Sequence, residues 1–357
     1  MKRLFRPLKI RHIIWLSLLA LIAWALRDIT FADVRGSLGR LSLVQVMALI
    51  LLNIGILILF SSRWWLVLRA QGFRLPYFSL VLYRLAAAGI NYFTPGPQFG
   101  GEPFQVYIVQ QRHWVPGSLA LASVTLDKLL ELLANFTFLV IGVAIILEAG
   151  LFGREAGVQA LLLVIGLFAL PAGYMFILSR GKSPATWLAG YISVRQPAVP
   201  GNRWLKLKMA HLAIAGVEEK LAQFCRRNPR ALVQAFFISA LVWFAMVMEY
   251  WLMLHFLGLR LNVFQVIASL TAARLAYLLP IPAGLGVLEA SQVMAMQALG
   301  IHPALGISIS MLIRARDISF GATGLWLVGV FTGSRSRAPL PVELAVNRLN
   351  GIEKEEL

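Results

Sequence analysis

The chain is poor in the residues that build metal sites and disulfide bonds. Its 357 residues include a single cysteine, Cys225, so the sequence excludes both an internal disulfide and a cysteine-based zinc cluster. The five histidines are scattered, and none has the HxxxH or HxxE spacing of a metal site. No nucleophile lies beside a base in a pattern typical of covalent catalysis. The sequence therefore predicts no metal, no cofactor and no enzymatic activity.

Apolar residues make up 59% of the chain, whereas soluble domains contain about 45–50%. Several apolar runs exceed the roughly 18 residues that a membrane-spanning helix requires, beginning with a helix at residues 13–26. The runs do not alternate with polar residues as the strands of a membrane barrel do. We therefore predict an all-α polytopic membrane protein. A single transmembrane domain would cover residues 1–333, and a polar cytoplasmic tail would cover residues 334–357.

The formal net charge of +17 is concentrated in segments that flank the apolar runs. Residues 1–11 contain five Lys or Arg residues, and the connector 180–230 contains ten. Cytoplasmic loops of membrane proteins carry such an excess of basic residues. The pattern predicts that the connector and both termini are cytoplasmic, in a bacterial inner membrane. It favours attraction to anionic lipids over binding to nucleic acid.

Residues of the first half of the chain reappear in the second half at a nearly constant offset. Leucines match by chance in apolar segments, but Pro, Glu, Gln and Trp do so rarely, because polar residues are scarce there. We predict two repeats, at about residues 43–148 and 231–332. Repeats with broken hydrophobic segments at matching places indicate a transport site at their interface. The residues that recur 186 positions later are Trp65, Gly72, Arg74, Leu75 and Phe78, and those that recur 187 positions later are Pro95, Glu102, Gln105, Gln110, Pro116, Ser123 and Gly142.

Each predicted repeat contains one hydrophobic segment that Pro and Gly interrupt, and we interpret each as a re-entrant hairpin. Counting crossings from a cytoplasmic N-terminus places one hairpin in each leaflet, so the repeats have inverted orientations. Backbone groups at the tips need partners, and we expect the tips to bracket a partly polar cavity. Alternatively, Pro and Gly only allow tight helix packing. The predicted tip residues are Pro95, Gly96, Pro97, Gly100, Gly101, Pro280, Pro282, Gly284 and Gly286.

Charged residues lie after both tips and in the helices that follow them. Asp127 aligns with Arg314, so these opposite charges could meet across the pseudo-symmetry axis. Arg314 could also pair with Asp317, three residues further on. Arginines would hold an anionic head group while carboxylates organise it. Alternatively, these charges are ion pairs that fasten the bundle. The candidate substrate-binding residues are Arg84, Glu102, Asp127, Lys128, Glu131, Arg274, Glu289, Arg314, Arg316 and Asp317.

Three motifs in these segments resemble those of the lysylphosphatidylglycerol synthase transmembrane-region family, which includes the flippase half of the bacterial multiple peptide resistance factor. They are PQFGGEP at 97–103, PIPAGLGVLE at 280–289, and DKLLE at 127–131, where the family pattern has Arg in place of Lys128. The resemblance covers about residues 10–333. It implies movement of a phospholipid or related anionic lipid between leaflets. The soluble aminoacyl-transfer domain of the resistance factor is expected to be absent, because only residues 334–357 follow the last predicted helix.

These observations predict an inner-membrane lipid translocase that works without ATP. Two other classes stay open: a membrane enzyme or enzyme subunit that acts on a lipid head group, and an ion-coupled transporter of small solutes. The expected partners are membrane lipids, mainly anionic. A homodimer and a separate lipid-modifying enzyme are further candidate partners.

Overall fold

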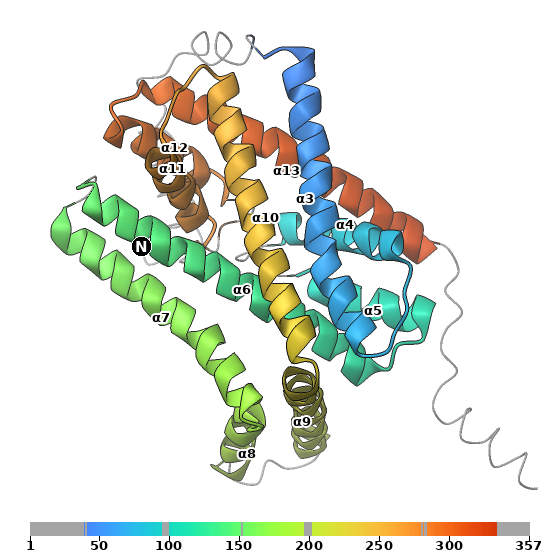
Figure 1. The fold of residues 1–357 in the computed structure, drawn as a ribbon. Coiled ribbons are helices and arrows are strands. Elements are labelled where there is room, and N and C mark those ends of the chain that lie inside the picture. The colour runs from blue at the N-terminus through green and yellow to red at the C-terminus, as the bar shows by residue number, and fades with distance from the viewer. Residues whose placement is uncertain are drawn as a thin grey trace, which may run out of the picture.

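The computed structural model describes residues 39, 41–94, 100–150, 153–195, 202–279, 281 and 284–333, and these ranges contain helices and no strand. The predicted all-α membrane protein is confirmed. Four helices, α3, α6, α7 and α10, are long and apolar enough to cross a membrane. The helices in Figure 1 are α3 Leu43–Ala70, α4 Tyr77–Phe93, α5 Glu102–His113, α6 Gly117–Glu148, α7 Arg154–Ser179, α8 Pro184–Arg195, α9 Asn202–Arg227, α10 Pro229–Phe256, α11 Val263–Ala276, α12 Val287–Ala298 and α13 Pro303–Gly333.

Several predicted features lie outside the described residues. They are the first helix at 13–26, the tail 334–357 and the tip residues Pro95, Gly96, Pro97, Pro280 and Pro282. The division of the chain into a transmembrane domain, a connector and a tail stays a prediction.

α6 is the central spanning helix of the bundle. In its most apolar window 44% of the residues are buried, against 17–22% in α3, α7 and α10. Its neighbours in the described chain include α3, α5, α7, α9, α10 and α11. Charged residues on α6 are therefore placed where several helices can supply partners.

α3 and α10 run side by side in opposite directions (Figure 1). Asn53 Nδ2 donates to Glu249 Oε1 at 3.0 Å, and Arg63 Nη1 donates to Ser239 Oγ at 3.1 Å. Ser239 follows Asn53 by 186 positions and Glu249 follows Arg63 by 186 positions, so each contact is the repeat counterpart of the other. This two-fold relation is the one that an inverted repeat requires. The orientation of either copy in a membrane stays a prediction.

Each half of the bundle also packs a helix against the other half. α4 lies along α13, and the corresponding helix α11 lies along α6. α4 and α13 approach so closely that a Cβ added to Gly89 would lie 2.5 Å from the backbone nitrogen of Leu325. Small residues commonly allow this approach in membranes, where close packing drives helix association. The two predicted repeats are therefore interlocked in one bundle.

Both predicted breaks are interruptions between helices. α4 ends at Phe93 before α5 begins at Glu102, and α11 ends at Ala276 before α12 begins at Val287. Gly100 has φ +145°, and Gly284 and Gly286 have φ +60° and +79°. A residue with a Cβ is strained at such angles, which explains why glycine stands there. Whether the breaks enter the membrane as re-entrant hairpins stays a prediction.

The connector folds into α8 and α9, which pack on each other beside α7. Glu218 on α9 is buried and accepts hydrogen bonds from the amides of Ala185 and Thr186 at 2.8 and 2.7 Å. It thus satisfies free amides in the first turn of α8. Burial alone would raise the pKa of Glu218, but the hydrogen bonds from Thr186 and Ala185 outweigh it and hold the pKa below its usual range.

Candidate functional site

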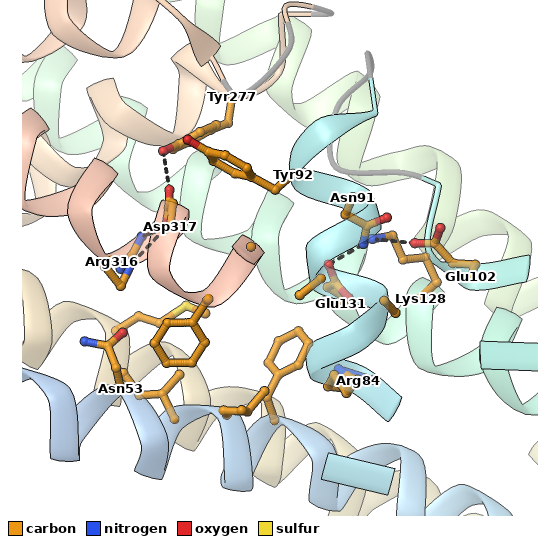
Figure 2. Close-up of a pocket in the computed structure, with 18 of the residues that line it drawn as sticks. Asn53, Arg84, Asn91, Tyr92, Glu102, Lys128, Glu131, Tyr277, Arg316 and Asp317 are labelled. Atoms are coloured by element: carbon orange, nitrogen blue, oxygen red, sulfur yellow. Dashed lines mark hydrogen bonds and ion pairs between the residues drawn. The ribbon is translucent and has the colours of Figure 1, made fainter. Parts of the chain in front are cut away.

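A cavity of about 290 Å³ lies between the two breaks of the bundle (Figure 2). Tyr92 and Glu102 line it beside the first break, and Tyr277 and Gly284 line it beside the second. α3 contributes Asn53 from below in the same view. Every candidate charged residue except Glu289 and Arg314 lines this cavity. Those that do are Arg84, Glu102, Asp127, Lys128, Glu131, Arg274, Arg316 and Asp317.

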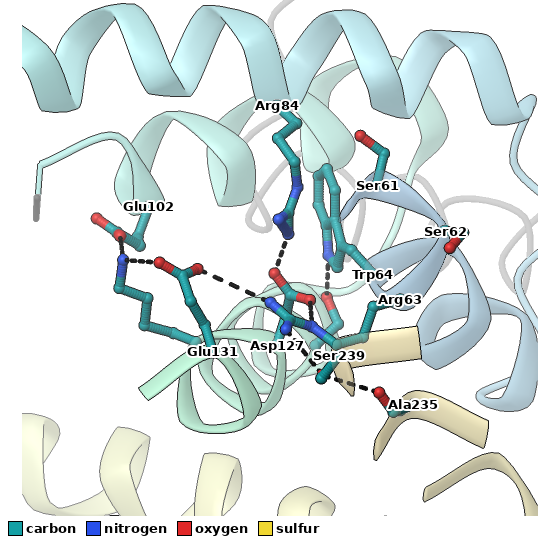
Figure 3. Close-up of polar contacts among 12 residues, drawn as sticks. Ser61, Ser62, Arg63, Trp64, Arg84, Glu102, Asp127, Glu131, Ala235 and Ser239 are labelled. Atoms are coloured by element: carbon teal, nitrogen blue, oxygen red, sulfur yellow. Dashed lines mark hydrogen bonds and ion pairs between the residues drawn. The ribbon is translucent and has the colours of Figure 1, made fainter. Parts of the chain in front are cut away.

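The first charge cluster, defined as Arg63, Arg84 and Asp127, joins three helices (Figure 3). Asp127 on α6 is 4% exposed and accepts a hydrogen bond from Arg63 Nε on α3 at 2.6 Å. Arg84 on α4 forms an ion pair with the other oxygen of this carboxylate. Within the described chain, Arg63 Nη2 and Arg84 Nε are buried without a hydrogen-bond partner. Arg63 Nη2 nevertheless lies 3.8 Å from Glu131 Oε2 in an ion pair, so Glu131 supplies a second anion for the two arginines, and Arg84 Nε is the spare donor.

The first tip ion pair, Lys128 with Glu102, connects α6 to the first break. Lys128 Nζ lies 3.1 Å from Glu102 and 3.0 Å from Glu131, so two carboxylates share this ammonium group. Glu102 Oε2 also accepts the backbone N–H of Gly100 at 2.8 Å. The carboxylate thereby satisfies a backbone group that the broken helix leaves without a partner.

The second tip ion pair, Arg314 with Glu289, repeats this arrangement in the other half. Glu289 Oε2 accepts the backbone N–H of Gly286 at 2.9 Å. Arg314 contacts both oxygens of Glu289, with Nη2 2.8 Å from Oε2, and also donates to the carbonyl of Gly284 at 3.1 Å. A bidentate guanidinium–carboxylate pair fixes geometry as well as charge.

The second charge cluster, defined as Glu249, Arg316 and Asp317, joins α10 to α13. Arg316 Nη1 lies 2.7 Å from Glu249 Oε1, and Arg316 Nε lies 2.8 Å from Asp317 Oδ1. The hydroxyl of Tyr277 donates to Asp317 Oδ2 at 2.9 Å (Figure 2). Glu249 is 3% exposed and Asn53 donates to it as well. This cluster has one more anion than cations.

Arg274 on α11 differs from the other cations that line the cavity. Within the described chain, no carboxylate lies within the 4.0 Å of an ion pair with it, whereas Arg84, Lys128 and Arg316 each have such a partner. Its guanidinium stacks over the Trp243 ring, 5.0 Å from the centroid, and Nη2 lies 3.4 Å from Met246 Sδ. An aromatic face holds a cation in place without neutralising it. Arg274 therefore keeps a net positive charge at the cavity wall.

Two expected contacts are wrong. Asp127 pairs with Arg63 and Arg84 and does not meet Arg314. Arg314 pairs with Glu289, and Asp317 pairs instead with the adjacent Arg316. Each carboxylate pairs with the cations nearest to it in the fold. Asp127 is buried and Glu289 is half-buried, and each would lose its nearest cation if the arginine paired with it turned towards another residue.

The sequence reading also missed Arg63, Glu249 and Asn53. The apolar run predicts a second spanning helix from about Leu43 to Ser61, but α3 continues to Ala70 and Arg63 is 1% exposed inside the bundle. Asp127 makes this burial tolerable by pairing with the guanidinium. A signal was available, since Arg63 and Glu249 are polar residues in apolar helices at the 186-residue offset of the repeat.

Comparisons with known proteins agree with the motifs. A family model described as "Lysylphosphatidylglycerol synthase TM region" matches residues 11–323. A UPF0104 membrane protein of Methanocaldococcus jannaschii is 23% identical over 74% of this chain and 77% of its own length. A UPF0104 membrane protein of Methanothermobacter thermautotrophicus is 22% identical over 85% and 90%, and one of Pyrococcus horikoshii is 23% identical over 75% and 81%. The predicted family and the predicted multi-pass membrane protein are confirmed.

Proposed function

The chain belongs to the lysylphosphatidylglycerol synthase TM region family, and from this premise we propose that it moves a phosphate-bearing lipid between membrane leaflets. The head group passes through the central cavity, and the acyl chains stay in the surrounding bilayer. The protein uses neither ATP nor covalent chemistry. The proposed translocation takes place in a bacterial inner membrane, with both termini of the chain in the cytoplasm.

The observation that supports this proposal most strongly is that, within the described chain, Arg274 lines the cavity without a carboxylate partner. If the charges served only to hold the helices together, each cation should form an ion pair with a carboxylate. Arg84, Lys128 and Arg316 do so. A charge inside a membrane protein costs free energy unless it has a partner or a purpose. A guanidinium at a cavity wall without a carboxylate partner in the described chain is suited to a phosphate oxygen, which it binds through a planar pair of donors.

The size and composition of the cavity support a head group as the cargo. Its volume of about 290 Å³ lies at the small end of ligand pockets, too small for a whole phospholipid. Polar lining comes from both halves, including Asn91 beside the first break and Tyr277 beside the second. Arg84, which has a spare donor at Nε, also borders the cavity. The phosphate oxygens exchange between Arg84 and Arg274.

The experiment compares lipids that differ in the phosphate. The purified full chain is reconstituted into liposomes that contain either a fluorescent phosphatidylglycerol or a fluorescent glucosylceramide, and exposure to the outer leaflet is followed by quenching with dithionite. We expect the protein to accelerate translocation of phosphatidylglycerol at least about tenfold more than that of the phosphate-free lipid, the factor expected for one charge-assisted hydrogen bond. Equal rates for both lipids would contradict the proposal.

The same vesicles separate the other two classes. Mass spectrometry of the recovered lipids should show unchanged masses, because no bond is made or broken. A new lipid product would indicate an enzyme. Translocation that appears only with an imposed proton or sodium gradient would indicate an ion-coupled transporter.

A further inference from the structure

A second hollow, of about 840 Å³, lies where the C-terminal end of α3 meets the N-terminal end of α10. Its walls include Trp65 and Arg69 on α3, Arg227 at the end of α9, and Arg230 at the start of α10. None of the candidate residues of the central cavity takes part in it. The hollow therefore needs an explanation of its own.

Three arginines give this hollow a strong positive charge. Arg69, Arg227 and Arg230 are exposed, and within the described chain no carboxylate lies within 4.0 Å of them to form an ion pair. The Arg69 guanidinium lies over the ring of Trp65, 4.9 Å from its centroid. Trp and Arg in this combination are typical of the level of the lipid head groups. No Asp or Glu lines the hollow, so a bound ammonium group would find no partner there.

The N-terminal end of α10 adds to the attraction for an anion. Its N-cap residue Asn228 makes no side-chain hydrogen bond to the first turn. The hydrogen bond from Leu232 N to Asn228 O, 3.1 Å, is the first one that the helix makes, so the amides of Arg230 and Ala231 have no acceptor within the helix. Such amides at the positive end of a helix dipole bind phosphate readily.

An apolar face leads away from the arginines along α10. Val233, Phe237 and Phe244 are 68%, 71% and 63% exposed. Val233 comes three residues after Arg230, Phe237 four residues after Val233, and Phe244 seven residues after Phe237. These intervals place them on one side of the helix, above Arg230. In a spanning helix this side faces the acyl chains of lipids. The positive hollow and the apolar face are together complementary to an anionic head group and an acyl chain.

We propose that this hollow is a binding site for an anionic phospholipid, separate from the central cavity. Arg69, Arg227, Arg230 and the free amides of α10 hold the phosphate, and an acyl chain lies along Val233 and Phe237. The anionic class follows from the arginines and from the lack of an acidic side chain in the lining. The site does not depend on the proposed translocation. It lies beside the basic connector, in the leaflet that the connector faces.

The test measures lipid binding to the full chain in detergent by native mass spectrometry. The triple variant Arg69→Gln/Arg227→Gln/Arg230→Gln is compared with Lys182→Gln/Lys220→Gln/Arg226→Gln, which removes the same charge from the connector at positions outside the hollow. For phosphatidylglycerol we expect the apparent Kd to rise at least about tenfold in the first variant and no more than about twofold in the second. Equal losses in both variants would overturn the proposal.

Two further arms identify the ligand. Phosphatidylcholine and inorganic phosphate are titrated under the same conditions, and both should bind at least about tenfold more weakly than phosphatidylglycerol, because one carries an unpaired ammonium and the other lacks acyl chains. Inorganic phosphate that competes at the lipid's own concentration would mean a simple anion site and would overturn the assignment to a lipid. Thermal unfolding of all variants verifies that each is folded.

Discussion

The two halves of the central site contain charge clusters that are built in opposite ways. In the first half one carboxylate, Asp127, is held by two guanidinium groups, those of Arg63 and Arg84. In the second half one guanidinium, that of Arg316, is held by the two carboxylates Glu249 and Asp317. The scaffold is thus nearly symmetric while the electrostatics are inverted. Under the proposed function, a head group that moves between the halves would meet a different electric field on each side.

The tips differ in the strength of their ion pairs. Lys128 divides its contacts between Glu102 and Glu131 and borders the cavity. Arg314 contacts both carboxylate oxygens of Glu289 and lies outside the cavity lining. A bidentate pair is stronger and more specific in geometry than one with a compact ammonium group. We therefore expect the first tip to loosen before the second when the site changes state.

Removal of the carboxylate at the centre of the first cluster is expected to have the largest effect. Asp127→Asn leaves Arg63 and Arg84 buried side by side without their shared anion, and should lower the free energy of unfolding by about 3–5 kcal/mol. The matched change Asp317→Asn leaves Arg316 paired with Glu249 and should cost about 1–2 kcal/mol. Denaturant titration of both proteins in mixed micelles measures the difference. Equal losses would show that the inverted clusters are energetically equivalent.

The two tip glutamates are expected to differ in their effect on transport. Glu289→Gln removes the carboxylate that forms the ion pair with Arg314 and should abolish lipid translocation, a loss of at least about 30-fold, while expression stays intact. Glu102→Gln leaves Lys128 paired with Glu131 and should slow translocation only about threefold. Rates in proteoliposomes, normalised to the amount of reconstituted protein, measure both. Wild-type translocation by the Glu289 variant would refute its role at the tip.

Two helix contacts join the halves of the bundle, α4 with α13 and α11 with α6, and they should differ in how well they tolerate an added methyl group. In Gly89→Ala the added Cβ meets the backbone of α13, which cannot rotate away, and we expect a loss of about 1–3 kcal/mol of stability. In Gly142→Ala the Cβ meets only side-chain atoms of Thr271, but these include the Thr271 Cβ at 2.9 Å, which a rotamer change cannot move, so we expect a smaller loss of about 1–2 kcal/mol. Gly55→Ala, with open space around the new Cβ, is the control. Thermal unfolding of the three variants gives the ranking, and a larger loss in Gly142→Ala would reverse it.

The sequence was sufficient to predict the helices and most of the charged residues that line the cavity, but it did not predict which charged residues pair with one another. The length of the apolar runs predicted the spanning helices that the structure describes. The repeat offset predicted that each half contains one interrupted hydrophobic segment. Pairing failed at Asp127 and Arg314, because an alignment relates equivalent positions but does not say which way a side chain turns. Arg63 was missed because a basic residue after an apolar run is typical of a loop, and only its contact with Asp127 reveals the burial.

The most direct measurement of the central claim is the translocation rate of phosphatidylglycerol with Arg274 neutralised. Arg274→Gln removes the cavity cation that has no carboxylate partner in the described chain, and Arg260→Gln removes an exposed arginine of the α10–α11 loop as the control. Neutralising Arg274 should leave the fold intact, because no ion pair within 4.0 Å is broken, and should slow translocation at least about tenfold. The control should keep the wild-type rate. A wild-type rate in the folded Arg274→Gln protein would contradict passage of a phosphate-bearing head group through this cavity.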